Sequence, residues 1–300
     1  MRKVIDLEIG MPKTATTSVA AEINRGRPGT QTSEDLPRPE GYGFDNYGHI
    51  FGGGGGGGTT APLDDGALAR EVVAMDQSGV EYGLLVNMPN NEIGQIHSDH
   101  PGRFKIFPAL NPLDGMRAVQ ELERLVRDQG ANGYRVSSLY SNLPANDRRY
   151  YPLYAKCVEL GIPVRIYTAM TYANDRPYEL GHPRHLDDIC IDFPELKVVA
   201  GLAGWPWIND MVGLLRRHPN LYCDTAAHRP CYLAKDGSGW EMFLQYGNSL
   251  LQDKVMVGFS RYLFNCGYDE LIAEYQQLPL KDAVLEKWLY GNGAAFFGES

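Results

Sequence analysis

The chain has 300 residues, of which 43% are hydrophobic and 22% charged, and its formal net charge is −9 at pH 7. This composition is typical of a soluble globular protein, and the acidic balance argues against nucleic acid or an anionic membrane as a partner. No apolar run approaches the roughly 20 residues of a membrane-spanning helix, and the N-terminus lacks the apolar stretch of a secretory signal. The five cysteines are dispersed without a CxxC pair, which predicts free thiols and a cytoplasmic location.

Short apolar, β-branched runs alternate with helix-like segments along most of the chain. We expect strands near residues 4, 82, 105, 133, 163, 197, 221 and 255. We expect helices over residues 64–75, 93–100, 115–129, 152–160, 185–193, 208–217, 239–246, 268–277 and 282–289. Eight such units predict an α/β protein with a closed (β/α)8 TIM-type barrel. A doubly wound open sheet is the alternative, but no GxGxxG motif supports it.

The first strand is followed by an irregular segment over residues 13–62, which contains seven consecutive glycines, Gly52 to Gly58. Such a run has no side chains to pack and loses much entropy on ordering. No Gly-Lys-Ser/Thr follows it, which argues against a phosphate-binding loop. We therefore expect a single barrel domain over residues 1–300 with a Gly-rich insertion at about 13–62. Its position after the first strand also suggests a lid over the substrate.

The carboxyl ends of the strands are where a (β/α)8 barrel keeps its chemistry. The polar residues expected at these ends or on adjacent alternating positions are Glu8, Asn87, Asn111, Arg135, Ser137, Arg165, Tyr167, Asp224, Ser260 and Arg261. His228 lies four residues past Asp224, in a loop that should overhang the barrel mouth. Trp205 follows the sixth strand and is a candidate wall for an apolar or aromatic substrate.

Several segments resemble the amidohydrolase superfamily, and within it the decarboxylase-like, amidohydrolase-related branch. They are AREVVAMDQSGVEYGLLV, RRYYPLYAKCVELGIPVRI, DRPYELGHPRHLDDICIDFPELKVV, GWPW, HPNLYCDTAAHRP and EKWLYGNGAAFFG. The resemblance covers the first strand and most of the chain from Leu63 onward. It implies the distorted barrel that the periodicity predicts and, by analogy with this branch, a homodimer.

The resemblance also implies a metal, usually zinc, but the sequence departs from the family's ligand pattern. The ExH motif of strand one reads Glu8-Ile9-Gly10, so only its glutamate matches. Tyr167 replaces the histidine of strand five, Leu202 that of strand six, and Ser260 the aspartate of strand eight. Zinc needs about four nitrogen, oxygen or sulfur ligands. We therefore expect no metal and no other cofactor.

Four residues are candidates for catalysis without a metal: Glu8, Tyr167, Asp224 and His228. Glu8 in a partly dry pocket could act as an acid or base, or could form a salt bridge to Arg165. Tyr167 could donate to an oxyanion, or could merely fill the vacated metal position. His228 titrates near neutral pH in its unperturbed form, or could be a structural histidine bonded to backbone.

The substrate-binding candidates are Asn87, Asn111, Arg135, Ser137, Arg165, Trp205, Ser260 and Arg261. The predicted function is metal-independent acid–base chemistry on a small organic substrate, with aromatic and polyketide-like molecules as candidates. Hydrolysis, decarboxylation or other C–C cleavage, and cyclisation all remain open. One alternative is a non-catalytic ligand-binding or partner subunit, and the other is a conventional zinc-dependent hydrolase or decarboxylase.

Overall fold

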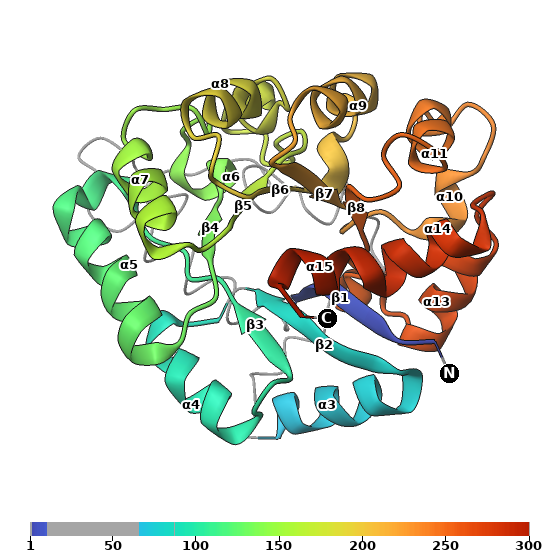
Figure 1. Cartoon of the computed structure of the whole chain (residues 1–300), viewed down its shortest axis with the longest axis horizontal. Coiled ribbons are helices and arrows are strands. Elements are labelled where there is room, and N and C mark those ends of the chain that lie inside the picture. The colour runs from blue at the N-terminus through green and yellow to red at the C-terminus, as the bar shows by residue number, and fades with distance from the viewer. Residues whose placement is uncertain (1, 11–65, 87, 300) are drawn as a thin grey trace.

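The computed structural model describes residues 2–10, 66–86 and 88–299 (Figure 1). The segment at 13–62, with its proposed lid, and Asn87 lie outside these residues. Strands and helices alternate around a ring, with the strands inside and the helices outside (Figure 1). The strands are β1 Val4–Gly10, β2 Val80–Val86, β3 Phe104–Ile106, β4 Tyr134–Val136, β5 Val164–Tyr167, β6 Val198–Gly201, β7 Leu221–Asp224 and β8 Val255–Met256. All eight predicted strands are confirmed.

The larger helices also confirm the sequence pattern, with ends shifted by a few residues. They are α3 Ala67–Ser78, α4 Ile93–Asp99, α5 Met116–Gln129, α7 Tyr151–Leu160, α8 His185–Asp192, α9 Ile208–Arg217, α11 Glu241–Gly247, α13 Tyr268–Gln276 and α14 Asp282–Glu286. The prediction did not include α6 Ser138–Ser141, α10 Pro230–Leu233, α12 Arg261–Phe264 and α15 Asn292–Phe297. The last predicted helix, 282–289, is helical throughout, because α14 continues into a π-helical turn, Lys287–Gly291, which leads into α15.

Parallel pairing joins β1 to β3 in one sheet and β4 to β8 in another. Backbone hydrogen bonds then connect the two sheets at both edges. Arg135 N donates to Pro108 O at 3.0 Å between the β3 and β4 segments, and Leu7 N donates to Val257 O at 2.8 Å between the β8 and β1 segments. The strands therefore form a closed (β/α)8 barrel, as predicted.

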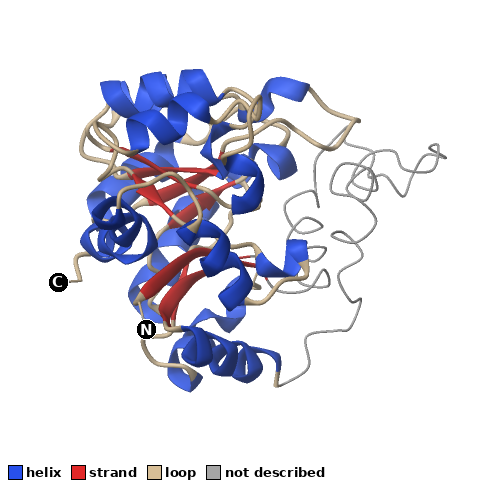
Figure 2. Cartoon of the chain, turned by 90° about the vertical axis from the view of Figure 1, so that its right-hand side faces the viewer, coloured by secondary structure: helices blue, strands red, loops and turns tan. Residues whose placement is uncertain are grey.

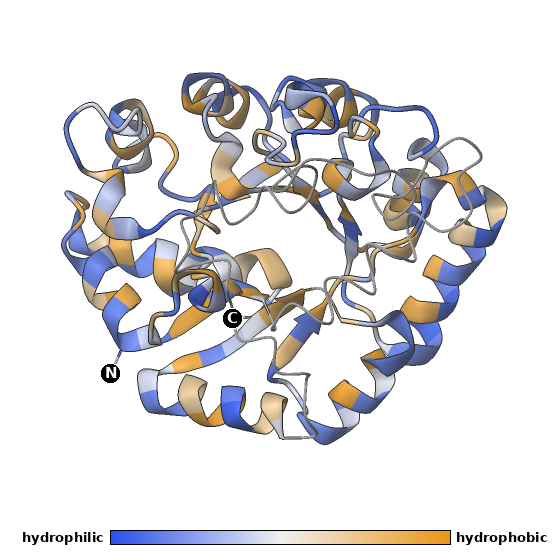
Figure 3. Ribbon diagram, turned by 180° about the vertical axis from the view of Figure 1, so that it is seen from behind, coloured by the Kyte–Doolittle hydropathy of each residue, from blue (hydrophilic) through white to orange (hydrophobic). Residues whose placement is uncertain are grey.

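The interior of the barrel is apolar toward the amino-terminal ends of the strands. Apolar side chains from several strands meet there with Phe296 of α15, which lies close to β1 (Figure 1). Between the strands and the outer helices lies the larger core, and orange hydrophobic residues alternate with blue polar ones along these helices (Figure 3). Figure 2 shows the strands enclosed by helices. None of the helices in the described ranges is long and apolar enough to cross a membrane.

Candidate active site

A bulge in β1 directs Glu8 into the barrel mouth. Asp6 pairs with Gly83 and Ile9 with Leu85, so three steps along β1 match two along β2. The Asp6 carboxylate stabilises this extra residue, because its Oδ1 accepts the backbone N–H of Glu8 at 2.9 Å. Bulges of this kind redirect a side chain beside active sites.

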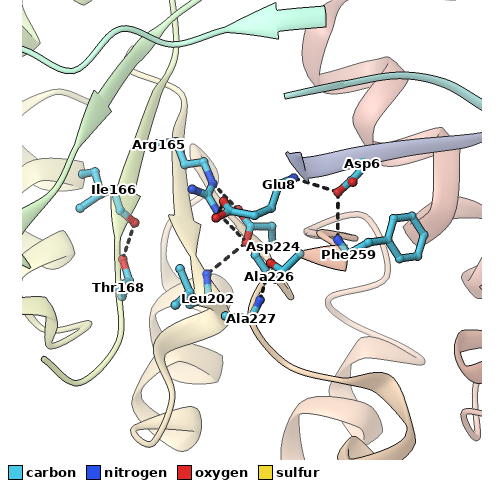
Figure 4. Close-up of polar contacts among 11 residues, drawn as sticks. Asp6, Glu8, Arg165, Ile166, Thr168, Leu202, Asp224, Ala226, Ala227 and Phe259 are labelled. Carbon is cyan, nitrogen blue, oxygen red and sulfur yellow. Dashed lines mark hydrogen bonds and ion pairs between the residues drawn. The ribbon is translucent and has the colours of Figure 1, made fainter. Parts of the chain in front are cut away.

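Glu8, Arg165 and Asp224 form one ion cluster, which joins β1, β5 and β7 (Figure 4). Arg165 Nη2 lies 2.6 Å from Glu8 Oε2. On the other side, Arg165 donates from Nε to Asp224 Oδ2 at 2.6 Å and from Nη2 to Asp224 Oδ1 at 3.1 Å. Asp224 is fully buried, Arg165 is 2% exposed, and only the Glu8 side chain, at 17%, has appreciable access to solvent. The salt bridge between Glu8 and Arg165 that the sequence left as an alternative is therefore present.

Glycine at the end of β6 provides the space for the guanidinium. A Cβ atom on Gly201 would lie 3.0 Å from Arg165 Cζ and 3.1 Å from its Nη2. Asp224 also orders the neighbouring loops, since its Oδ1 accepts the N–H groups of Leu202 and Ala226, each at 3.1 Å (Figure 4). The cluster is therefore built into the backbone of three strands and two loops.

Arg165 keeps its charge in this buried position. Burial acts to lower the pKa of Arg165, but the charges of Asp224 and Glu8 and the hydrogen bonds to them outweigh burial, so that pKa is raised. Among residues 2–10, 66–86 and 88–299, Arg165 Nη1 has no hydrogen-bond partner. Arg135 is the register neighbour of Arg165 on β4, and burial lowers the pKa of Arg135 while Tyr140 and Glu8 favour its charged form. Two buried guanidinium groups thus lie on neighbouring strands, β4 and β5.

Asp6 is a second buried carboxyl group, two residues before Glu8 on β1 (Figure 4). Its Oδ1 also accepts the N–H of Phe259 at 2.9 Å, which ties β1 to the loop after β8. The Tyr268 hydroxyl lies 3.4 Å from Asp6 Oδ2 and donates to Glu71 Oε1 at 2.6 Å. Burial raises the pKa of Asp6 from 3.8 to about 7, although the two backbone hydrogen bonds oppose the rise.

His228 and Trp205 lie together in a cavity beside the ion cluster. His228 Nε2 is 3.2 Å from Leu202 O, the bond to backbone that the sequence left as an alternative role. Burial lowers the pKa of His228 to about 4, so the imidazole is neutral near pH 7. The cavity is lined by both residues and by Trp240.

The remaining predicted site residues have other contacts. Tyr167 donates its hydroxyl to Met170 O at 2.7 Å, and Asn111 Oδ1 accepts the N–H of Leu113 at 3.1 Å. Ser260 Oγ accepts the N–H of Ala227 at 2.9 Å.

Ser137 is buried just after β4, and Arg261 forms an ion pair with Glu71, with Nη1 3.0 Å from Oε2. The catalytic and binding roles expected for the predicted residues remain predictions.

Residues that the sequence prediction did not select also shape this region: Asp6, Gly201 and Trp240. Asp6 and Glu8 stand two residues apart in the first strand, and this spacing could have indicated that both carboxyl groups belong to the site. The bulge between them has no clear sequence signal. Gly201 stands at the end of the sixth strand, where the missing side chain marks the close approach of another group.

The structure is a closed (β/α)8 barrel with ionised side chains at the carboxyl ends of its strands. The protein is therefore of the TIM-barrel class, with a polar site at the barrel mouth. The chain belongs to the amidohydrolase family, because the family model Amidohydro_2 matches residues 59–298. A curated relative, 2-amino-3-carboxymuconate-6-semialdehyde decarboxylase of Dictyostelium discoideum, is 26% identical over 131 residues. That match covers 42% of this chain and only 34% of the relative.

Solved structures of low sequence identity share the whole fold. A TIM-barrel protein from Bordetella bronchiseptica is 24% identical, with a TM-score of 0.71 over 99% of this chain and 98% of its own. A 5-carboxyvanillate decarboxylase from Novosphingobium aromaticivorans, with bound manganese and 3-methoxy-4-hydroxy-5-nitrobenzoic acid, is 13% identical, with a TM-score of 0.67 over 99% of this chain and 97% of its own.

The residues present do not fit the metal that the family implies. Within the described ranges, no three His, Cys, Asp or Glu side chains come together as a ligand group. Glu8, the one family ligand retained, is paired with Arg165, and the Tyr167 hydroxyl is bonded to a backbone carbonyl. The position between Glu8 and Asp224 holds a guanidinium group instead.

Proposed function

We propose that this chain is a metal-independent enzyme of the amidohydrolase fold that cleaves a C–C bond of a small organic acid, as in decarboxylation. The observation that carries the proposal is Arg165 held between Glu8 and Asp224 at the carboxyl ends of the strands. In this position the guanidinium supplies a fixed positive charge that cannot be lost at any working pH.

Recognition of the substrate would use charge. Glu8 and Asp224 already offset the charge of Arg165, so Arg165 would contribute the directed N–H groups of Nη1, which has no partner in the described part of the chain. Arg135 adds a second positive charge beside it. A guanidinium recognises a carboxylate through directed N–H groups, and such bonds are stronger in a buried site. An organic acid is therefore the substrate class that these two residues support.

Proton transfer would fall to Glu8. Of the two carboxylates of the ion cluster, Glu8 is the one whose side chain reaches solvent, while Asp224 is fully buried. Loss of CO2 leaves an electron pair on carbon that must take up a proton. As the carboxylate partner of Arg165, Glu8 would first take this proton from solvent, and the carboxylic acid so formed would deliver it to carbon. The names of the decarboxylases among the relatives support this reaction type, and an aromatic acid is the first candidate. A homodimer also remains a proposal from the family resemblance.

Glu8→Gln is expected to lower kcat for CO2 release by at least about 100-fold, because the amide keeps the volume of the side chain but cannot transfer the proton. The assay would follow CO2 release from a panel of hydroxybenzoic acids, including 5-carboxyvanillate and 2,6-dihydroxybenzoate, using protein prepared without added metal and treated with EDTA. Glu81→Gln is the matched control, since Glu81 forms an exposed ion pair with Lys3 on the barrel's other end and should leave kcat unchanged.

Two outcomes would count against this function. If the panel acids bind but none is turned over, the ligand-binding alternative is favoured. If turnover appears only after Mn²⁺ or Zn²⁺ is added, the enzyme is metal-dependent.

A further inference from the structure

A cavity of about 700 Å³ lies among the loops that follow β6, β7 and β8. Its walls include Trp205, His228, Tyr232, Trp240, Leu263 and Phe264. None of its lining residues belongs to the ion cluster of Glu8, Arg165 and Asp224. The lining combines these apolar and aromatic side chains with polar ones, among them Arg229, Lys235 and Asp236, and cavities of this size are typical of small-molecule sites.

The imidazole of His228 lies near two indole rings. Its ring centroid is 4.8 Å from that of Trp240, at an interplanar angle of 62°, and 6.0 Å from that of Trp205. Trp240 is itself buried and packs edge-on against Phe243. These contacts fix the ring, so that the cavity presents flat aromatic surfaces of defined orientation.

Hydrogen bonding determines which nitrogen of His228 carries the proton. Nε2 lies 3.2 Å from Leu202 O, and a carbonyl oxygen can only accept, so Nε2 is the donor. In a neutral ring, Nδ1 then carries a lone pair and can only accept. Nδ1 has no hydrogen-bond partner within residues 2–10, 66–86 and 88–299.

The charged side chains around the cavity do not add a strong anion site. Arg229 is neutralised by Glu274, at 2.6 Å, and by Glu270. Lys235 Nζ lies 4.3 Å from the centroid of the Tyr232 ring, and the adjacent Asp236 also lines the cavity. Among the lining residues, His228 therefore offers an acceptor nitrogen that has no hydrogen-bond partner in the described ranges.

We propose that this cavity is a second ligand site, which binds a flat aromatic molecule through a hydrogen bond from its ring N–H or hydroxyl to His228 Nδ1. The site goes beyond the proposed function, because it requires neither the ion cluster nor turnover. The indole rings of Trp205 and Trp240 would pack against the ligand ring. The lone pair of Nδ1 would favour ligands that carry an N–H or O–H group over ligands that have no hydrogen-bond donor.

Indole and 1-methylindole are a suitable probe pair, since they differ only in replacement of the donor N–H by N–CH3. Isothermal titration calorimetry of the full chain at pH 7.5 is expected to show indole binding at least about 10-fold more tightly. His228→Phe keeps an aromatic ring near the two tryptophans and should reduce this preference to less than about 2-fold. Lys235→Met is the matched control and should leave the preference unchanged, because both probes are neutral.

Equal affinities of the wild-type protein for the two probes would overturn the proposal, and so would a preference that survives in a folded His228→Phe variant. If that variant does not fold, the wild-type affinity ratio decides. The assay needs no catalysis, so failure of the proposed decarboxylation would leave its outcome interpretable.

Discussion

Replacing Arg165 with methionine is expected to lower the free energy of unfolding by about 3–5 kcal/mol at pH 7. Methionine approximates the length of the arginine stem but leaves two carboxylates, Glu8 and Asp224, without the cation that pairs with both. Both lie within 2.6 Å of the guanidinium in the native cluster, and Asp224 is fully buried. Removing one partner of a buried ion pair costs far more than removing a surface pair, because the remaining charge cannot be solvated.

The decrease in the free energy of unfolding caused by Arg165→Met should depend on pH. Protonating a carboxyl group of the cluster removes the unpaired charge, so the stability deficit of Arg165→Met should shrink as the pH falls from 7 toward 4. Urea unfolding at several pH values measures this directly. Arg184→Met is the control, since Arg184 forms an exposed pair with Glu179 and should cost less than about 1 kcal/mol. A deficit below about 1 kcal/mol for Arg165→Met, unchanged with pH, would contradict the role of the guanidinium as the cation of the cluster.

Asp6 is expected to make the protein less stable as the pH rises. The pKa of Asp6 is raised by burial from 3.8 to about 7 in the folded state, so the folded chain binds a proton that the unfolded chain releases. The stability from this proton is fully present below pH 3.8 and is lost as the pH rises to about 7. At about 1.4 kcal/mol per pKa unit, the effect between pH 5 and pH 8 is on the order of 3 kcal/mol.

Asp6→Asn should remove this dependence, because the amide oxygen can still accept the N–H groups of Glu8 and Phe259. The stability of the variant relative to wild type should therefore increase by about 3 kcal/mol between pH 5 and pH 8. The other ionisable groups around Asp6 are Glu8, Glu71, Tyr268 and Tyr275, and they are retained in the variant. Asp236→Asn, at an exposed position, is the control. A difference between Asp6→Asn and wild type that stays constant with pH would show that Asp6 is ionised throughout.

The barrel could be predicted from the sequence because its signal is local. Each buried strand, such as Val164–Tyr167, is a short β-branched run, and each amphipathic helix, such as Met116–Gln129, repeats its apolar residues at the helical period. The short helix Pro230–Leu233 has too few residues to show a period. The π-helical turn that separates α14 from α15 likewise depends on packing rather than on a local pattern.

The ion cluster was predictable only in part. The sequence placed Glu8, Arg165 and Asp224 near strand ends, but it did not determine whether Arg165 pointed into the barrel. That direction depends on the strand register and on the space that Gly201 leaves, and both are set by pairing between segments far apart in the chain. The bulge that turns Glu8 inward depends on the Asp6 carboxylate in the same way.

The central claim is that the guanidinium of Arg165 stands in place of the metal ion of the family. A metal titration of the wild-type protein tests this claim most directly. The chain would be purified without added metal, incubated with excess Zn²⁺ or Mn²⁺, dialysed, and measured by elemental analysis together with its melting temperature. We predict well under 0.1 metal ion per chain and an unchanged melting temperature, because Arg165 already occupies the position between the two carboxylates. Binding of about one metal ion per chain, with a raised melting temperature, would contradict this prediction and indicate a metal-dependent amidohydrolase.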